Sequence, residues 1–436
     1  MQPLMEFAET VLRTKSDNFS EYPIYLKATA GMRMLNSFDR ARVINACREI
    51  LSDLTYNRFM FHKSYARVIS GEEEAIYGWA GANFVLGSLL KSSEGAGVVI
   101  DPDLTYGTLE IGGASSQIAF YQSDEDIMSN LFKLQIGQGK HWNVYAHSFL
   151  YFGINEAWNR MGAYVTTIGI ESSVPEEAHN PCLAGGISTS FESTIFFNEG
   201  HETFHMEDNG KKESYRTKLV NDSPTGNYDE CSAVVTNLIH KNYNTWCKFA
   251  HSGDCSFNDV YQPKLPSQSE SFGEFLALSE YYDVFTFLNI PNRSSLRTLQ
   301  NATKHLCSMT GKELDEFNNG RLESDYVLKM CFNSAFAFQL LYTGFGFQMD
   351  DNITAADVVN GQKVGWPLGS MLYEINTLPW AYIPKHDPFD VNGKSNVIAF
   401  VVVMATCITV GIICIFRKRP HYGYSKLNSV QMMKPE

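Results

Sequence analysis

The chain has little positive charge, no low-complexity run and no evident internal repeat. Its 436 residues carry 35 Lys and Arg against 48 Asp and Glu, which gives a formal net charge of −13. Nucleic-acid-binding proteins usually present a basic face, so this balance argues against a nucleic-acid partner. It does not argue against nucleotides, because a bound metal ion can neutralise their phosphates. The cysteine spacing also fits no zinc site.

The N-terminus lacks the apolar core that a signal peptide or membrane anchor requires. Residues 1–20 instead contain the charged side chains Glu6, Glu9, Arg13, Lys15 and Asp17. We therefore expect that the true start lies upstream or that this chain is an alternative product. A third option is a tail-anchored protein that faces the cytosol, although the charge of the C-terminal tail argues against it.

One segment near the C-terminus is apolar throughout. Residues 397–416 carry no charge and are long enough to cross the bilayer core as a helix. Arg417, Lys418 and Arg419 follow at once, which predicts a cytosolic tail over residues 417–436. Residues 386–396 then form a stalk, and the remainder lies in the lumen or outside the cell. We expect a Golgi or plasma-membrane protein.

The glycosylation and cysteine patterns agree with that topology. All five Asn-x-Ser/Thr sequons precede the apolar segment, at Asn18, Asn221, Asn292, Asn301 and Asn352. Six cysteines fall in close groups that would pair in an oxidising compartment, although spacing alone does not fix their connectivity. Our guess is Cys182–Cys231, Cys247–Cys255 and Cys307–Cys331, with Cys47 left over.

Hydrophobic periodicity gives a coarse map of the elements. It predicts helices over residues 3–15, 37–52, 70–90, 145–160, 271–288 and 326–341. It predicts strands over residues 22–26, 67–69, 108–111 and 117–121. Residues 195–230 are polar and poorly patterned, which indicates an exposed insertion. Alternating strands and helices predict an α/β protein with mixed sheets.

Two motifs carry most of the chemistry. In one, a strand runs into the Gly112–Gly113 turn, which is followed by small hydroxyl side chains. Such a turn lets backbone N–H groups approach a phosphate closely. In the other, Glu72, Glu73 and Glu74 open a helix, and a carboxylate there can activate water. Together they indicate hydrolysis of a phosphate ester or anhydride. Taken alone, the glutamates could simply complement the helix dipole, and the turn could be structural.

These motifs resemble signature regions of the ecto-apyrases, the nucleoside triphosphate diphosphohydrolases. Ala-Thr-Ala-Gly-Met-Arg-Met-Leu at 28–35 resembles the second signature, and Ser-Gly-Glu-Glu-Glu-Ala-Ile-Tyr-Gly-Trp at 70–79 the third. Leu-Glu-Ile-Gly-Gly-Ala-Ser-Ser-Gln at 109–117 resembles the fourth. Later landmarks follow in order at 144–150, 180–182, 261–263 and 365–372. The resemblance covers residues 3–385.

The resemblance implies a two-lobed, actin-like fold related to ribonuclease H, with a C-terminal transmembrane helix. Residues 1–70 and 356–385 would be what remains of the first lobe, and residues 71–355 would form the second. A nucleotide would bind between the lobes together with Ca²⁺ or Mg²⁺. Expected partners are nucleoside di- and triphosphates and the membrane. A second copy of the chain and a clathrin adaptor, at the sorting-type motif beginning at Tyr424, are further candidates.

Matching by position also implies roles for single residues. Glu74 would be the general base, and Ser115 and Gln117 would hold the attacking water. Glu110 stands where the family usually has aspartate and would hold the metal through water. Phosphate would be lined by Thr29, Arg33, Gly112, Gly113 and Ala114. The base would be sandwiched by Tyr282 and Phe345, for which core packing is the alternative; Arg33 alone could be a surface charge.

The implied activity is metal-dependent removal of the terminal phosphate from UDP, GDP or ADP, and from triphosphates. The family's first signature, an Asp-x-Gly-Ser/Thr-type loop, is absent from these residues. The alternative is therefore a non-catalytic truncated isoform that binds nucleotide or associates with full-length enzyme. A sugar kinase of the same fold is a third option, which the lumenal placement disfavours.

Overall fold

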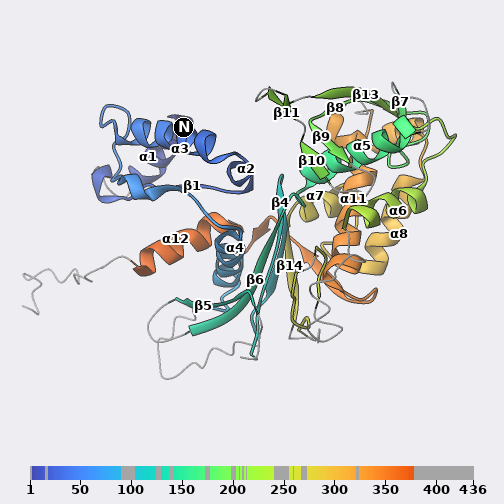
Figure 1. The fold of residues 1–436 in the computed structure, drawn as a ribbon. Helices are drawn as coiled ribbons and strands as arrows, with labels where there is room; N and C mark the ends of the chain where they lie inside the picture. Colours follow the sequence, from blue (N-terminus) through green and yellow to red (C-terminus); the bar gives the residue numbers. More distant parts are fainter. Residues whose placement is uncertain are drawn as a thin grey trace, which may run out of the picture. The chain divides into compact units, whose positions relative to one another are not determined.

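A seven-stranded mixed sheet lies at the centre of the fold (Figure 1). Its strand order is β15-β16-β14-β3-β4-β6-β5, with β14 parallel to both β3 and β16 and the other pairs antiparallel. The strands are β3 (Gly107–Ile111), β4 (Ser115–Tyr121), β5 (Leu131–Gln135), β6 (His141–Leu150), β14 (Phe275–Ser279), β15 (Arg293–Ser295) and β16 (Asn352–Ala355). The computed structural model describes residues 2–14, 18–89, 104–123, 129–136, 141–171, 177–197, 203–205, 207–208, 211–212, 214–239, 255–258, 260–266, 273–320 and 324–377.

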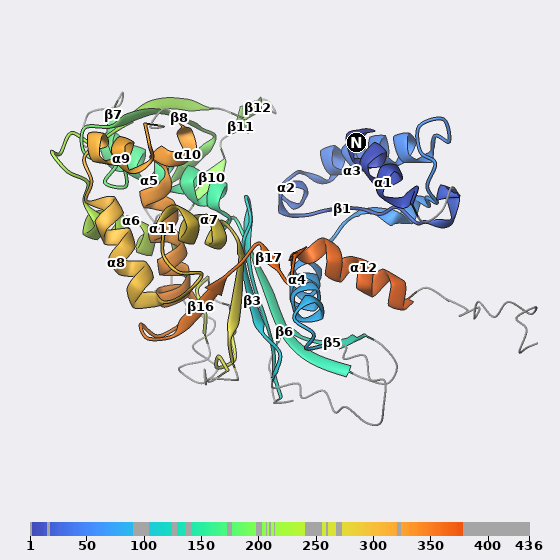
Figure 2. The same ribbon diagram turned by 180° about the vertical axis from the view of Figure 1, so that it is seen from behind.

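Side chains alternate between two apolar layers on the faces of this sheet, as strand geometry requires. Ile118 and Phe120 of β4 belong to the larger apolar cluster, whereas Ala119 between them belongs to another. The larger cluster joins the sheet to α5 (Ile154–Glu171), α6 (Tyr228–Ile239), α7 (Glu280–Phe287), α8 (Leu296–Cys307) and α11 (Met330–Gln339). The opposite face is covered by α4 (Gly71–Val85), as Figure 2 shows.

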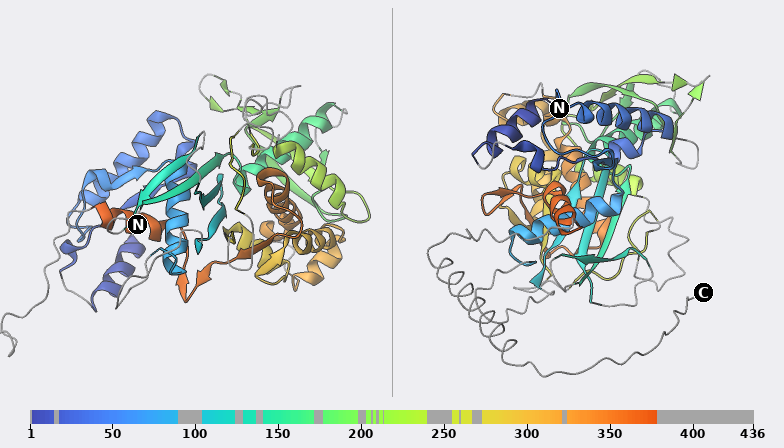
Figure 3. Two further views of the ribbon diagram at one scale, coloured as in Figure 1. Left: turned by 90° about the horizontal axis from the view of Figure 1, so that it is seen from below. Right: turned by 90° about the vertical axis from the view of Figure 1, so that its left-hand side faces the viewer.

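Helix α4 begins with a complete capping box. The Ser70 side chain accepts from the Glu73 backbone N–H, and the Glu73 carboxylate accepts from the Ser70 N–H. The helix packs closely against α12 (Trp366–Thr377), which runs across it in Figure 2 and lies beside it in Figure 3. A Cβ on Gly369 would lie 1.8 Å from the Tyr77 carbonyl oxygen. The two helix backbones therefore meet at a distance that only glycine allows.

The N-terminal segment contains a separate two-stranded sheet and several helices. Its elements are α1 (Gln2–Leu12), η1 (Phe19–Glu21), β1 (Leu26–Ala28), α2 (Ala30–Arg33), α3 (Ser37–Ser52), η2 (Lys63–Tyr65) and β2 (Ala66–Val68). Strands β1 and β2 are parallel to each other. Four side chains make up its fully buried cluster: Met5, Phe19, Leu51 and Phe59.

A second sheet has the order β7-β13-β8, from β7 (Glu177–His179), β13 (Tyr215–Val220) and β8 (Ser188–Ser193). Three short antiparallel pairs complete the strands: β9 (Ile195–Phe197) with β10 (Thr203–His205), β11 (Glu207–Asp208) with β12 (Lys211–Lys212), and β17 (Val358–Val359) with β18 (Gln362–Lys363). The remaining helices are α9 (Gly311–Phe317), α10 (Asp325–Leu328) and the π-helix η6 (Leu340–Phe345).

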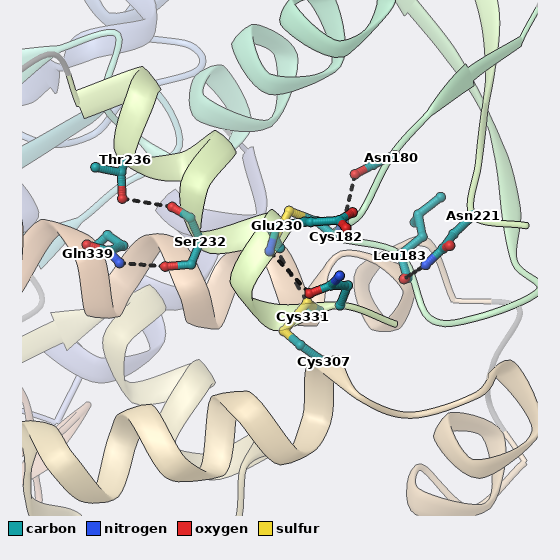
Figure 4. The surroundings of a disulfide bond; sticks show 12 residues. Asn180, Cys182, Leu183, Asn221, Glu230, Ser232, Thr236, Cys307, Cys331 and Gln339 are labelled. Atoms are coloured by element: carbon teal, nitrogen blue, oxygen red, sulfur yellow. Dashed lines mark hydrogen bonds between the residues drawn. A yellow bond between two sulfur atoms is a disulfide. The ribbon is translucent and has the colours of Figure 1, made fainter. Parts of the chain in front are cut away.

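Two disulfides lie within the larger apolar cluster and link helices α6, α8 and α11 and the turn at Cys182 (Figure 4). Cys182 is bonded to Cys231 and Cys307 to Cys331, which confirms two of the three guessed pairs. Cys255 is also disulfide-bonded, but its guessed partner, Cys247, lies outside the described residues. Within the described residues Cys47 forms no disulfide, as expected.

The α/β class and several elements are confirmed, but three predicted helices are wrong in part. The first half of the predicted helix 145–160 is strand β6, which pairs with both β4 and β5; only from Ile154 is the chain helical. The predicted helix 271–288 is strand β14 followed directly by α7. The predicted helix 326–341 is divided at Lys329 into α10 and α11. The spacing of apolar residues cannot distinguish a doubly buried strand from a buried helix.

Two other predictions also need correction. Residues 195–230 are not simply an insertion, because β13 is the central strand of its sheet and Leu219 is fully buried. The predicted strand at 22–26 begins only at Leu26.

The sequon at Asn221 is buried, and its side chain donates to the Leu183 carbonyl at 2.7 Å (Figure 4). Because it is only 1% exposed, this side chain is closed to glycosylation in the folded state.

The predicted stalk, membrane span and tail, residues 386–436, lie outside the described residues, and so does Tyr424. Among the residues that the structure describes, no helix is both long and apolar enough to cross a membrane.

Candidate functional site

Glu74 lies in the first turn of α4 with 6% of its surface exposed. Its Oε2 accepts a hydrogen bond from Arg33 Nη2 at 2.8 Å. Burial raises the pKa of the Glu74 carboxyl, and the charge of Arg33 offsets part of that rise. A carboxylate with a raised pKa is a better proton acceptor near neutral pH, which is what a general base requires.

Arg33 connects three separate parts of the chain. It ends the short helix α2, and besides Glu74 it donates to the Ile69 carbonyl and to Ser115 Oγ, both at 3.2 Å. Ser115 opens strand β4, directly after the glycine turn. The guanidinium therefore brings the second, third and fourth signature motifs together, and it is not the isolated surface charge that the sequence left open.

Gln117 extends this network into the sheet. Its Nε2 donates to Ser115 Oγ and, at 3.0 Å, to Ser148 Oγ, which lies opposite Gln117 on β6. Its Oε1 is buried and has no partner among the described residues. A buried acceptor without a partner is costly unless it is satisfied by water or ligand. This oxygen is therefore suited to orient a water beside Ser115. Sequence analysis missed Ser148, since only pairing of the strands reveals it.

Glu110 points from β3 toward the same helix. A Cβ on Gly78 of α4 would lie 3.7 Å from Glu110 Oε2. The other carboxylate oxygen, Oε1, accepts from Ser279 Oγ at 3.0 Å. Burial and then the negative charge of Glu74 raise the pKa of Glu110 to about 7. The two carboxylates that the sequence singled out thus repel each other across one site.

Hydrogen bonds from the start of α5 fix the turn between β3 and β4. The carbonyl oxygens of Gly112 and Gly113 accept from the N–H groups of Ile154 and Asn155 at 2.8 and 3.0 Å. No acceptor for the N–H groups of Gly113 and Ala114 is found within the described part of the chain. Adjacent free N–H groups in a fixed turn can bind an anion such as phosphate.

The other candidate binding residues are less closely tied to this network. Thr29 precedes α2, and its side chain does not cap that helix. Tyr282 is half-buried on α7. Phe345 is only 3% exposed, and its ring packs at 5.8 Å from Phe149 and at 5.6 Å from Phe257. A base could stack on that ring only if this packing opened, so in this structure the ring serves the core.

His147 lies on strand β6. It is largely buried, and burial lowers the pKa of its imidazole. Its Nδ1 makes no hydrogen bond to any described residue and lies 3.8 Å from Glu72 Oε1.

The donor chemistry fits a hard divalent cation. The carboxylates of Glu74 and Glu110 and the hydroxyls of Ser115 and Ser279 supply only oxygen. A cation between two like charges would relieve the repulsion that raises the pKa of Glu110. No group of three or more His, Cys, Asp or Glu side chains that could hold a metal occurs among the described residues. Such an ion would thus take most of its ligands from water and from phosphate, as Mg²⁺ commonly does.

Together these residues offer a buried carboxylate, an amide oxygen without a partner among the described residues, and a turn with two free N–H groups. Comparisons with known sequences identify the family. The profile of the GDA1/CD39 (nucleoside phosphatase) family matches residues 1–398. Ectonucleoside triphosphate diphosphohydrolase 1 of Bos taurus is 30% identical over 427 residues, which cover 94% of this chain and 76% of that protein. Ectonucleoside triphosphate diphosphohydrolase 2 of Mus musculus is 30% identical over 395 residues, or 87% and 72% of the two chains.

A solved structure shares the fold. The nucleoside triphosphate hydrolase structure from Neospora caninum superposes with a TM-score of 0.56 at 17% identity, over 86% of this chain and 78% of that one. The chain belongs to the GDA1/CD39 nucleoside phosphatase family. It shares its α/β fold with that structure, and the two-lobed, actin-like form of the fold stays a prediction from the resemblance.

Proposed function

We propose that the chain hydrolyses the terminal phosphate of nucleoside diphosphates, and also of triphosphates, with Ca²⁺ or Mg²⁺ as cofactor. The observation that carries this proposal is the connected set of Arg33, Glu74, Ser115 and Gln117. Its members come from three motifs, yet hydrogen bonds join them into one network. The names of the relatives, triphosphate diphosphohydrolases, support the same substrate class.

Glu74 would act as the general base. A water held by the Gln117 amide oxygen and the Ser115 hydroxyl would lie within reach of the Glu74 carboxylate. As the water oxygen bonds to phosphorus, its proton passes to Glu74 and the bond from phosphorus to the bridging oxygen breaks. The products are inorganic phosphate and a nucleotide shorter by one phosphate. No phosphoenzyme is required, because the nucleophile is water itself.

The remaining residues would hold charge in place, since phosphoryl transfer depends mainly on positioning and charge stabilisation. The N–H groups of Gly113 and Ala114 would donate to phosphate oxygens, and Arg33 would supply a fixed positive charge beside Glu74. Thr29 would line the phosphate side. Glu110 would hold the cation through a water, and the ion would screen the phosphate charge when bound.

The disulfides support our proposal for the compartment. Two bridges among the described residues fit an oxidising environment, so we place the catalytic part in the lumen or outside the cell. We further propose that residues 397–416 anchor it in a Golgi or plasma membrane. Stacking of the base on Tyr282 would tolerate several bases, which fits use of UDP, GDP and ADP.

The test compares two adjacent glutamates in the full chain. Phosphate release from UDP, GDP, ADP, UTP and ATP is measured with Ca²⁺, Mg²⁺ or EDTA. Glu74→Gln should lose about 10²- to 10⁴-fold in turnover, because the amide is nearly isosteric but cannot accept the proton. Glu73→Gln is the matched control, since glutamine also completes a capping box and Glu73 pairs with Arg67 away from Glu74.

Equal turnover in the two variants would refute the assignment of the base. A folded wild-type chain that releases no phosphate with either cation would refute the proposed hydrolysis. It would favour the alternative, a non-catalytic isoform that binds nucleotide or a full-length enzyme. Unchanged release in EDTA would refute only the metal dependence.

A further inference from the structure

Ser279 has a backbone conformation that disfavours a side chain. Its φ is 58° and its ψ is −124°. The other non-glycine residues with positive φ in the described structure are five asparagines and Tyr151, and asparagine tolerates the left-handed region. The ψ of Ser279 places it outside the left-handed helical region. In the region that Ser279 occupies, glycine is the residue that fits without strain.

The strain arises from an abrupt change of element. Strand β14 ends at Ser279 and helix α7 begins at Glu280, with no loop between them. A sharp strand-to-helix turn of this kind displays a side chain at the end of a sheet, as the strained serine turn of the α/β-hydrolases does. Glycine would make the same turn with less strain. The local geometry alone therefore gives no reason for a side chain at this position.

The Ser279 side chain makes one hydrogen bond, to Glu110. Leu278 pairs with Glu110 in the parallel register of β14 and β3, so Ser279 lies one residue beyond Glu110 at the adjacent strand end. Its Oγ donates to Glu110 Oε1 at 3.0 Å. Ser279 is exposed, so this bond is not needed to satisfy a buried hydroxyl. The turn thus presents one donor to one candidate metal-binding carboxylate.

We propose that Ser279 is a positioning residue, whose strained turn directs its hydroxyl to Glu110 and fixes the carboxylate that holds the metal-bound water. The inference rests on the proposed function. A glutamate has one more rotatable bond than an aspartate, so more conformational freedom must be removed to hold its carboxylate in one place. Repulsion from Glu74 would also drive the Glu110 carboxylate away from the site. The Ser279 hydroxyl opposes both effects.

Three substitutions in the full chain separate positioning from stability. Ser279→Gly removes the hydroxyl and the strain together, and Ser279→Ala removes the hydroxyl but keeps a side chain in the strained conformation. Asn319→Gly is the control, because Asn319 also has a positive φ, of 56°, but is exposed on another turn. Each variant is measured for its melting temperature in EDTA, the rise of that temperature with Ca²⁺ or Mg²⁺, and the cation concentration that gives half-maximal phosphate release.

Ser279→Gly should melt about 2 °C higher than wild type in EDTA, because backbone strain is relieved. It should nevertheless need about 10-fold more cation for half-maximal release, since one hydrogen bond to a charged group is lost. Ser279→Ala should need a similar excess of cation without melting higher. Asn319→Gly should leave the cation requirement unchanged. Gain of stability with loss of cation affinity is the result that a purely structural serine would not give.

A Ser279→Gly variant with the wild-type cation requirement would overturn the positioning role. So would a wild-type melting temperature that does not respond to either cation. The rise of the melting temperature with cation can be measured whether or not the chain hydrolyses a nucleotide. A wild type that shifts with cation but releases no phosphate therefore contradicts the proposed hydrolysis while leaving the role of Ser279 open to measurement by the shift.

Discussion

The region around the seven-stranded sheet and the N-terminal segment both contribute to the site, but they hold their side chains differently. Strands β3 and β4 lie between apolar layers on both faces, and Glu74 is buried against them. The N-terminal segment has one cluster of four buried apolar side chains and contributes Arg33, which ends helix α2. Arg33 stays in place mainly through the three hydrogen bonds that it donates. Packing positions one half of the site, and charge and hydrogen bonding position the other.

The first prediction tests the unequal packing directly. Leu109 of β3 is fully buried in the large cluster, and Leu51 is equally hidden in the small one. Leu109→Ala should lower the free energy of unfolding by about 4 kcal/mol, and Leu51→Ala by about 2 kcal/mol, because partly exposed neighbours can close a cavity in the small cluster. Denaturant unfolding measures both. Equal losses would mean that the two regions are packed alike.

The second prediction concerns the glycine contact between α4 and α12. Gly369→Ala should lower the free energy of unfolding by about 3 kcal/mol, because the new Cβ would meet the Tyr77 carbonyl oxygen and force the helices apart. Gly365→Ala is the matched control, since its Cβ would make only an ordinary contact, 3.5 Å from Pro367 Cδ. Thermal melting of the two variants side by side checks this. If both melt alike, close backbone contact does not hold the helices.

The third prediction is a pH dependence within the large-sheet region. Burial raises the pKa of Glu280 to about 7, although Asn333 Nδ2 donates to its carboxylate at 2.6 Å. The folded state then prefers the protonated form, so stability falls as pH rises from about 4.5 to about 7 and levels off above. Glu280→Gln should remove the part of this fall that Glu280 causes, while that of Glu110 remains, and should be more stable at pH 8 by up to about 3 kcal/mol. Parallel stability curves for wild type and variant would show that Glu280 is not responsible.

The fourth prediction isolates the hydrogen-bonded half of the site. Arg33→Ala should reduce phosphate release about 10- to 100-fold, equivalent to about 1.4–2.7 kcal/mol, because Glu74 and Ser115 lose their common donor. Arg67→Ala is the control, since Arg67 pairs with the neighbouring Glu73 near the surface. It should change turnover less than about 3-fold. Similar losses in both would show that either arginine merely supports the start of α4.

Sequence patterns were most reliable where the signal is local. The predicted helix over residues 37–52 matches α3, and the acidic run after Ser70 marked the start of α4 because a capping box uses neighbouring residues. They failed where distant segments decide. β6 is a strand because it pairs on both sides, and Asn221 is buried because Leu183 accepts its side-chain N–H. Phe345, which the resemblance implied as a base-stacking residue, packs against the edges or faces of Phe149 and Phe257, which stack on each other.

The sequence by itself determined the family, the α/β class and the residue types of the site, since these depend on motifs of consecutive side chains. The tertiary structure decided which of those side chains meet. It placed Arg33 between Glu74 and Ser115, Ser148 beside Gln117, and the Ser279 hydroxyl on Glu110. None of these contacts follows from spacing, because each joins elements whose distance is set by strand pairing and helix packing. The positive φ of Ser279 could not be read from a serine, because only the turn from β14 to α7 imposes it.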